Sequence, residues 1–311
     1  MNNNVSIDKV RLPKKGRRER GNSPLSRYAF VFFLPTAAAF CIGFLFPFLW
    51  GIYLSFFQFR TINKLTFVGL QNYARAMADR QFWYSFGFSA LFTIVTVILI
   101  NVLAFTVAYA LTRSIKGKNI FRTVFFMPNL IGGIVLGFIW QIILNGIFAR
   151  YAMNVTSGTA NAFWGLVILT CWQQIGYMMI IYIAALGSVP EALIEAAKID
   201  GAGSMQIFLR LGIPAALPAI FLSFLLSVVW YYNETVLSAI YFGSDFTTLP
   251  LELSKFQASY NNIIGNASGK NANEAIYMAG TFLSILPLLV FYFFTQKKFT
   301  DGIDKAGITG E

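Results

Sequence analysis

The chain has 311 residues, of which 57% are hydrophobic and 17% aromatic, while only 12% are charged. A soluble domain carries about a quarter charged residues, so one water-soluble core could not hide this much apolar surface. Composition therefore excludes a soluble globular protein and indicates an integral membrane protein. The net charge of +11 does not indicate nucleic-acid binding, because the basic residues cluster at the ends of apolar runs, where they act as topology signals.

Catalytic and metal-binding patterns are missing from the sequence. It has no histidine, and its two cysteines, Cys41 and Cys171, lie within apolar runs without metal or redox spacing. No glycine-rich nucleotide loop followed by a lysine occurs, so ATP must be handled by another chain. We therefore expect no catalytic residues, no metal site and no cofactor bound by this chain.

Six segments are long and apolar enough to cross a bilayer, which takes about 20 helical residues. They run approximately over residues 28–57, 84–111, 123–144, 163–186, 215–242 and 275–294. No internal repeat is evident. The sequence predicts an all-α membrane protein with one membrane domain, residues 28–298, between a basic arm, residues 1–27, and a tail, residues 299–311.

The distribution of lysine and arginine predicts the orientation. If both termini lie inside, 17 of these residues fall on the cytoplasmic side and seven on the outer side. Cytoplasmic loops carry this excess of positive charge. We expect a multi-pass protein of the bacterial plasma (inner) membrane with both termini in the cytoplasm, and a basic arm that touches anionic lipid.

A polar stretch, IEAAKIDGAGSMQIFLRLGIP at residues 194–214, separates the fourth and fifth apolar runs. Upstream of it, Ser188 and Glu191 have the spacing of a capping box, which predicts that a helix begins there. Gly201 can adopt the left-handed conformation that ends this helix. We expect a second short helix capped by Ser204 and ended by Pro214, which makes the loop, residues 188–214, helix–Gly–helix.

The side chains of this loop favour contact with another protein. Small residues at Ala196 and Ala197 leave a low surface that a partner can approach closely, and the loop is more apolar than a water-facing connection needs. The alternative is an amphipathic loop that rests on the membrane surface.

The loop resembles the cytoplasmic signature of binding-protein-dependent ABC importer permeases, which Glu195-Ala196-Ala197, Gly201 and Leu211-Gly-Ile-Pro214 match. FLPTAAAFCIGFLFPFLWGIYLSF, FVGLQNYARAMADRQFW, FRTVFFMPNLIGGIVLGFIW and CWQQIGYMMIIYIAALGSVPEALIEAAKIDGA resemble the carbohydrate (oligosaccharide) uptake branch of that family. FVGLQNY is similar to the maltose-transporter subunit that contacts sugar, whereas WYYNETVLSAIYFGSDFTTLPLELSKF is similar to its partner subunit. The chain thus combines features of both membrane subunits.

The resemblance implies a type I ABC importer fold with a cytoplasmic coupling helix, and a transport subunit rather than an enzyme. It implies a heterodimer with a second, homologous permease, two ATPase subunits that bind ATP-Mg, and an extracellular or periplasmic binding protein that delivers a sugar or oligosaccharide. The residues that it implies for ATPase docking are Glu195, Ala196, Ala197, Asp200 and Gly201.

Polar and aromatic residues at membrane depth are candidates for the sugar path. Aromatic faces stack on sugar C–H groups, and amides and carboxylates bond to hydroxyl groups. The candidates are Trp140, Trp172, Gln173, Gln174, Tyr231, Tyr232, Asn233 and Glu234. Glu234 is the main intramembrane charge, and such a charge is by default a functional residue. The alternative is that these side chains form interfacial belts or join helices.

Three other classes of protein remain as alternatives. An ion-coupled secondary transporter of a small polar solute would need more intramembrane acids or histidines and often carries inverted repeats. A membrane-embedded enzyme would need a cluster of His, Asp or Cys. A pure anchoring protein would leave the helix–Gly–helix loop without a use.

Overall fold

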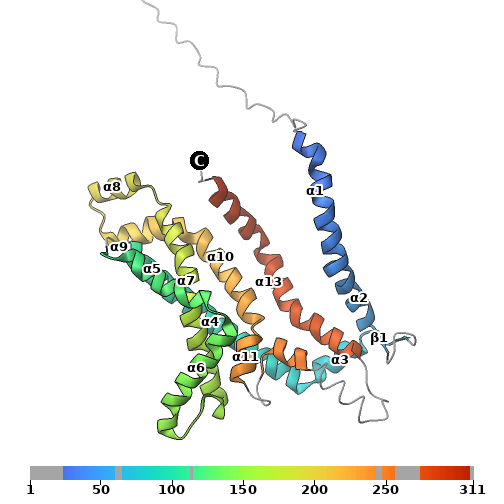
Figure 1. The fold of residues 1–311 in the computed structure, drawn as a ribbon. Coiled ribbons are helices and arrows are strands. Elements are labelled where there is room, and N and C mark those ends of the chain that lie inside the picture. The colour runs from blue at the N-terminus through green and yellow to red at the C-terminus, as the bar shows by residue number, and fades with distance from the viewer. Residues whose placement is uncertain (1–23, 60–64, 113–114, 243–246, 256–273, 309–311) are drawn as a thin grey trace, which may run out of the picture. The chain divides into compact units, whose positions relative to one another are not determined.

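The computed structural model describes residues 24–59, 65–112, 115–242, 247–255 and 274–308 (Figure 1). Most of the predicted basic arm, residues 1–23, and the last three residues of the tail lie outside the described residues. The chain divides into two compact units, Met1–Tyr53 and Leu54–Glu311.

The described part of the first unit is one long apolar helix, whose last two residues, Leu54 and Ser55, belong to the second unit. It begins as α1, Pro24–Phe40, continues through a π-helical turn, Cys41–Leu45, and runs on as α2, Phe46–Ser55. Aromatic rings follow one another at four-residue spacing, with ring centroids 5.3 Å apart for Phe40 and Phe44 and 5.7 Å apart for Phe44 and Phe48. Side chains three and four residues apart share one helix face, so these rings stack along it.

The described residues of the second unit form helices and one pair of short strands. Its elements in chain order are β1 Phe57–Gln58, β2 Thr66–Phe67, α3 Gln71–Ala78, α4 Arg80–Thr112, α5 Lys118–Phe126, η2 Met127–Leu130, α6 Gly133–Phe148, η3 Ala149–Tyr151, η4 Val155–Ser157, α7 Thr159–Gly187, α8 Glu191–Ile199, α9 Ser204–Ile207, η5 Phe208–Gly212, α10 Ile213–Tyr232, α11 Val236–Tyr241 and α13 Glu274–Ile308. Residues 249–255 are also helical. The two strands pair antiparallel, Phe57 opposite Phe67.

Six helical stretches of the described residues are long and apolar enough to span a membrane. They are Phe33–Ser55, Arg80–Thr112, Gly133–Tyr151, Thr159–Gly187, Ser204–Tyr232 and Glu274–Gln296. This confirms the predicted all-α class with six spans. Because lipid is as apolar as the side chains that it touches, the spans keep many large apolar residues exposed.

The core of the second unit lies where α7 packs against α4, and α10 packs against both. Of the spans, α7 is the most buried. Phe92 and Ile100 of α4 and Leu166, Met178 and Tyr182 of α7 are completely buried there. α5 and η2 also pack against α7, while α13 packs against α3 and α10.

A glycine allows α5 to approach α7 closely. A Cβ atom added to Gly176 would lie 2.0 Å from the carbonyl oxygen of Phe125 and 2.7 Å from the Cα atom of Phe126. Both are backbone atoms that a side-chain rotation cannot move. Gly176 therefore fixes the depth at which the end of α5 sits on α7.

The fifth span differs from its prediction at both ends. Pro214 was expected to end a short helix, but α9, η5 and α10 form one continuous helix. In the π-helical turn, the Ile213 amide donates to the Phe208 carbonyl, one residue further back than in an α-helix. That turn absorbs a proline near the start of α10, since proline has no amide to donate and clashes with a regular preceding turn.

The run predicted as one span, residues 215–242, is broken near its end. α10 ends at Tyr232 and α11 begins at Val236. The carboxylate Oε1 of Glu234 accepts a hydrogen bond of 2.8 Å from the Leu237 amide and so caps α11. A carboxylate bound to free amides at a helix start is favourable.

Candidate coupling helix and translocation face

α8 begins differently from the prediction. Pro190, not Ser188, is the residue before its first turn, and no side chain caps it. The Ser188 hydroxyl donates instead to the Ala185 carbonyl at 2.7 Å, within the end of α7. The predicted capping box of Ser188 and Glu191 is therefore wrong. Glu191 lies in the first turn, where the helix dipole favours an acid.

The end of α8 is as predicted. Gly201 has a φ of 81°. Its amide donates to the Lys198 carbonyl at 3.1 Å, and the Ala202 amide donates to the Ala197 carbonyl at 2.9 Å. These two bonds form a Schellman motif, which satisfies carbonyls at the helix end and needs a left-handed residue at this position.

The connection from α8 to the fifth span is short. Gly203 precedes α9, and its amide donates to the side-chain oxygen of Gln206 at 3.1 Å. Gly203, rather than the expected Ser204, therefore occupies the capping position. Because α9 runs on into α10 without a break, α8 is joined through a few residues to the whole of the fifth span.

The predicted docking residues lie together on this element. Glu195, Ala196, Asp200 and Gly201 are exposed and Ala197 is half-buried. Ile199 on the same helix is 86% exposed. Leu193 on the same helix is 52% exposed, so α8 keeps some apolar surface open beside its charged residues.

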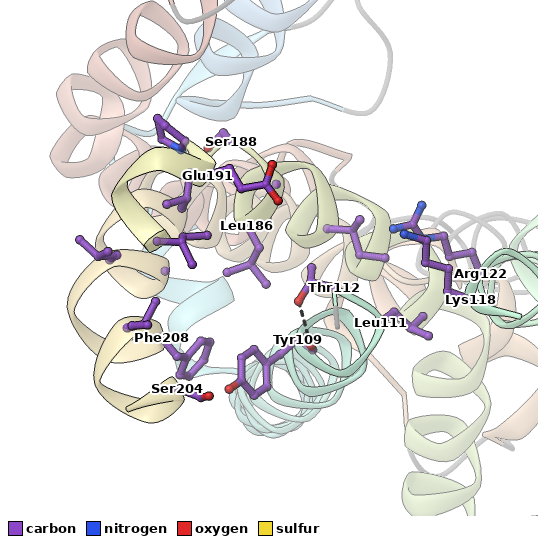
Figure 2. A pocket seen from close by; sticks show the side chains of 18 residues that line it. Tyr109, Leu111, Thr112, Lys118, Arg122, Leu186, Ser188, Glu191, Ser204 and Phe208 are labelled. Carbon is purple, nitrogen blue, oxygen red and sulfur yellow. Dashed lines mark hydrogen bonds between the residues drawn. The ribbon is translucent and has the colours of Figure 1, made fainter. Parts of the chain in front are cut away.

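Aromatic packing holds the base of the loop against α4. The Phe208 ring lies with its centroid 4.0 Å from that of Tyr109 and 5.8 Å from that of Phe105. Figure 2 shows Phe208 and Tyr109 facing one another. The base of the loop is therefore packed against α4 as well as being continuous with α10.

The candidates on α6 and α7 lie close to each other. The Trp140 and Trp172 ring centroids are 5.3 Å apart. Trp172 is 41% exposed and Trp140 is half-buried. Gln173 is buried and donates weakly to the Ile131 carbonyl at 3.5 Å, while Gln174 accepts from the Asn129 amide at 3.1 Å. The tryptophans thus present accessible surface, and the two amides mainly join α7 to the segment before α6.

The sugar-path candidates at the end of α10 also divide into accessible residues and buried residues that join helices. Tyr231 and Tyr232 are buried, and the Tyr232 hydroxyl donates to the Ser284 carbonyl of α13 at 2.8 Å. Asn233 is exposed and donates to the Val229 carbonyl at 2.8 Å. Glu234 is half-buried. Only the last two residues, at the helix break, combine a polar side chain with some access.

The TTLP segment holds this break in place. The backbone carbonyl of Glu234 accepts hydrogen bonds of 3.1 Å from the hydroxyls of Ser238 and Thr248. The next amide, that of Leu249, donates to the Ser89 hydroxyl of α4 at 2.6 Å. The two halves of the motif WYYNETVL…TTLP therefore meet in space through the Thr248 hydroxyl, and the Leu249 amide fastens the second half to Ser89 of α4.

The FVGLQNY motif has a structural use. Gly69 has a φ of 60°. Asn72 is completely buried, and its side-chain amide donates to the carbonyls of Ser55 and Phe57 at 2.8 Å each. The Tyr73 hydroxyl lies 2.6 Å from the Ser55 hydroxyl. The motif thus anchors α3 to the end of α2 and to the hairpin.

Sequence reasoning missed one polar junction in the core. Asn101 of α4 accepts a hydrogen bond from the Tyr182 hydroxyl of α7, and its amide donates to the Val97 carbonyl at 2.7 Å. The same amide lies 3.4 Å from the Ser227 hydroxyl of α10. A lone asparagine inside an apolar run was the available signal, since polar groups in spans join helices.

Comparison with known proteins shows what class of protein this architecture defines. Residues 103–300 match the family described as the binding-protein-dependent transport system inner membrane component. That match covers the coupling loop and four of the six spans. The chain belongs to this family. It is a membrane-spanning permease subunit of an ABC importer, which confirms the predicted class and excludes the enzyme and ion-coupled alternatives.

Similarity to individual relatives indicates which branch of the permease family the chain resembles. The chain is 42% identical over 206 residues to the probable starch degradation products transport system permease protein AmyD of Thermoanaerobacterium thermosulfurigenes, covering 64% of this chain and 70% of the relative. It is 30% identical to the multiple sugar-binding transport system permease protein MsmF of Streptococcus mutans, covering 60% and 68%. It is 28% identical to the sn-glycerol-3-phosphate permease protein UgpA of Brucella abortus, covering 83% and 90%.

Solved structures show the same fold. A bacterial ABC transporter that imports the acidic polysaccharide alginate matches with a TM-score of 0.67 at 16% identity, covering 89% of this chain and 97% of that chain. The MetNI methionine ABC transporter matches with a TM-score of 0.51 at 18% identity, covering 73% and 99%. These likenesses confirm the type I importer permease fold.

Proposed function

We propose that this subunit forms half of the translocation path for a sugar or oligosaccharide, and that it is driven by ATPase subunits docked on α8. The observation that carries the proposal is the exposed helix Glu191–Ile199, closed by Gly201 and joined directly to the fifth span. The named relatives that transport starch products and multiple sugars support the substrate class.

The mechanism follows from how α8 is attached. Two ATPase subunits that close on ATP-Mg draw the α8 helices of this chain and of a second, homologous permease together. Glu195 supplies a charge for a basic ATPase residue, Ala196 and Ala197 allow close approach, and Gly201 keeps α8 at a fixed angle to α9. The motion opens the path toward an extracellular or periplasmic binding protein that has delivered the sugar.

The accessible polar and aromatic groups form this chain's share of the path. Trp140 and Trp172 offer faces for stacking on the C–H surface of a sugar, and Asn233 and Glu234 offer hydrogen bonds to hydroxyls. Gln173, Tyr231 and Tyr232, which are buried, and Gln174, which is half-buried, support the helices that carry these groups. In this arrangement both termini and α8 lie on the cytoplasmic face, which the excess of basic residues on that side supports.

Reconstitution with the partner permease, the ATPases and the binding protein tests the proposal. Uptake of radiolabelled maltodextrin should require both ATP and the binding protein and be insensitive to a collapsed proton or sodium gradient. Glu195→Arg should abolish co-purification of the ATPases, whereas Glu191→Gln, at the start of the same helix, should retain it. Co-purification with Glu195→Arg at the wild-type level would refute docking through this residue.

A further inference from the structure

A cavity of about 680 Å³ lies beneath α8, between the coupling helix and the ends of the spans (Figure 2). Its walls come from the last turn of α4, the first two turns of α5, the end of α7, the start of α8, and α9 with η5. The face of α8 that carries the docking residues is exposed, so this cavity is distinct from the surface proposed for the ATPase.

The charged groups of the cavity favour an anion. Lys118 and Arg122, one turn apart on α5, both point into it, and Glu191 contributes the opposing charge (Figure 2). Two cations against one acid leave a net positive charge. The Nε atom of Arg122 is buried and has no hydrogen-bond partner in the described part of the chain. A buried donor without a partner is unfavourable, so the Nε–H group of Arg122 lacks an acceptor.

Two helix starts add to the positive potential. α5 begins after Gly117 and α8 after Pro190, and neither helix start has a side-chain cap. Lys118, Pro190 and Glu191 all line the cavity. The first amides of a helix have no acceptor within that helix and carry the positive end of its dipole, which suits a phosphate group.

The exposed face of α5 indicates which kind of molecule the phosphate group belongs to. Ile120, Phe121 and Val124 are 69%, 47% and 55% exposed. On a nine-residue helix they alternate with Lys118 and Arg122 and give it an apolar face beside a basic one. Such a helix lies in the membrane interface, with basic groups at headgroup level and apolar groups against acyl chains.

We propose that this cavity binds the phosphate of an anionic membrane phospholipid. Lys118 and Arg122 contact the phosphate, and the acyl chains lie over Ile120 and Val124. A soluble phosphate would satisfy the same cations but would leave the apolar face of α5 unused. The bound lipid bridges α5 and the start of α8, so it stiffens the coupling helix against the spans. This site is independent of the transported solute and of nucleotide.

Native mass spectrometry of the full-length chain in detergent tests the site directly, with phosphatidylglycerol as the probe and phosphatidylcholine as the comparison lipid. Wild type should retain phosphatidylglycerol in preference to phosphatidylcholine. Lys118→Gln and Arg122→Gln should each weaken retention about fivefold, as expected for one cation near an anionic headgroup. Glu191→Gln should strengthen it. Lys198→Gln, which removes a cation from α8 outside the cavity, is the matched control and should change nothing.

Three results would overturn the proposal. Equal retention by wild type and Lys118→Gln would show that the cation pair is not the site, and since Lys118 is exposed this variant is expected to fold. Equal weakening by Lys198→Gln would show a diffuse surface effect. Displacement of phosphatidylglycerol by inorganic phosphate at equal concentration would show that the cavity takes a soluble phosphate rather than a lipid. None of these measurements involves ATP or sugar, so they stand apart from tests of transport.

Discussion

Replacing Gly201 is the sharpest test of how force reaches the spans. The residue has a φ of 81°, and a Cβ atom added to it would meet nothing within 4 Å. Gly201→Ala therefore introduces backbone strain without a packing clash. The left-handed conformation is unfavourable for an L-residue by about 1–2 kcal/mol. The population of the Gly201 turn with its two hydrogen bonds, relative to conformations without them, should then fall about 5- to 30-fold.

The effect should depend on the residue type in a defined order. Asn tolerates the left-handed region better than Ala, and a β-branched residue tolerates it least. We expect transport coupling to decrease in the order Gly201, Gly201→Asn, Gly201→Ala, Gly201→Val. Gly203→Ala is the matched control, because Gly203 has a φ of −70° and equally open surroundings.

Two measurements on the assembled transporter report the effect of replacing Gly201. Binding-protein-stimulated ATP hydrolysis reports coupling. Hydrogen exchange reports the turn itself, because the amides of Gly201 and Ala202 lose their bonds to the Lys198 and Ala197 carbonyls when it opens. If Gly201→Ala and Gly203→Ala gave the same exchange and the same hydrolysis, the argument from backbone conformation would be refuted.

Two further predictions concern packing. Gly176→Ala should lower the stability of the chain by about 3 kcal/mol, the upper end for overpacking, because its Cβ meets the Phe125 backbone. Gly87→Ala in α4 adds a methyl group to open space and should raise the stability by up to about 1 kcal/mol, since alanine favours a helix over glycine. Unchanged melting of both variants in detergent would disprove the close approach. Tyr232→Phe should destabilise by about 1 kcal/mol through loss of the bond to Ser284, and leave unchanged the sugar concentration that half-stimulates ATP hydrolysis. A shift in that concentration would instead place the hydroxyl in the sugar path.

Local signals in the sequence predicted the parts of the fold that depend on near neighbours. Gly201 ends α8 because a left-handed turn needs only glycine and the carbonyls of the preceding turn. The number of spans follows from the length of each apolar run. The proposed docking residues, in contrast, were assigned from the resemblance to importer permeases rather than from local signals.

The features that were mispredicted or missed depend either on an irregular turn that local signals do not predict or on contacts distant in sequence. Pro214 did not end its helix, because a π-helical turn before it relieves the clash. The break after Tyr232 escaped notice because hydropathy averages over Asn233 and Glu234, while Ser89 and Thr248 secure the break from other elements. The role of Gly176 requires knowledge of where the Phe125 backbone runs.

Because the fifth span is one continuous helix, a tilt at one end moves the other end. From Ser204 to Tyr232 it has 29 residues. At 1.5 Å per residue this is a strut of about 43 Å, so a tilt of about 10° displaces its far end by about 7 Å. The π-helical turn at Phe208–Gly212 interrupts the regular α-helical hydrogen bonding of this strut, and it lies near the end that joins α8. If the ATPase subunits move α8 as proposed, flexure in these five residues reduces the displacement that reaches the far end of the span.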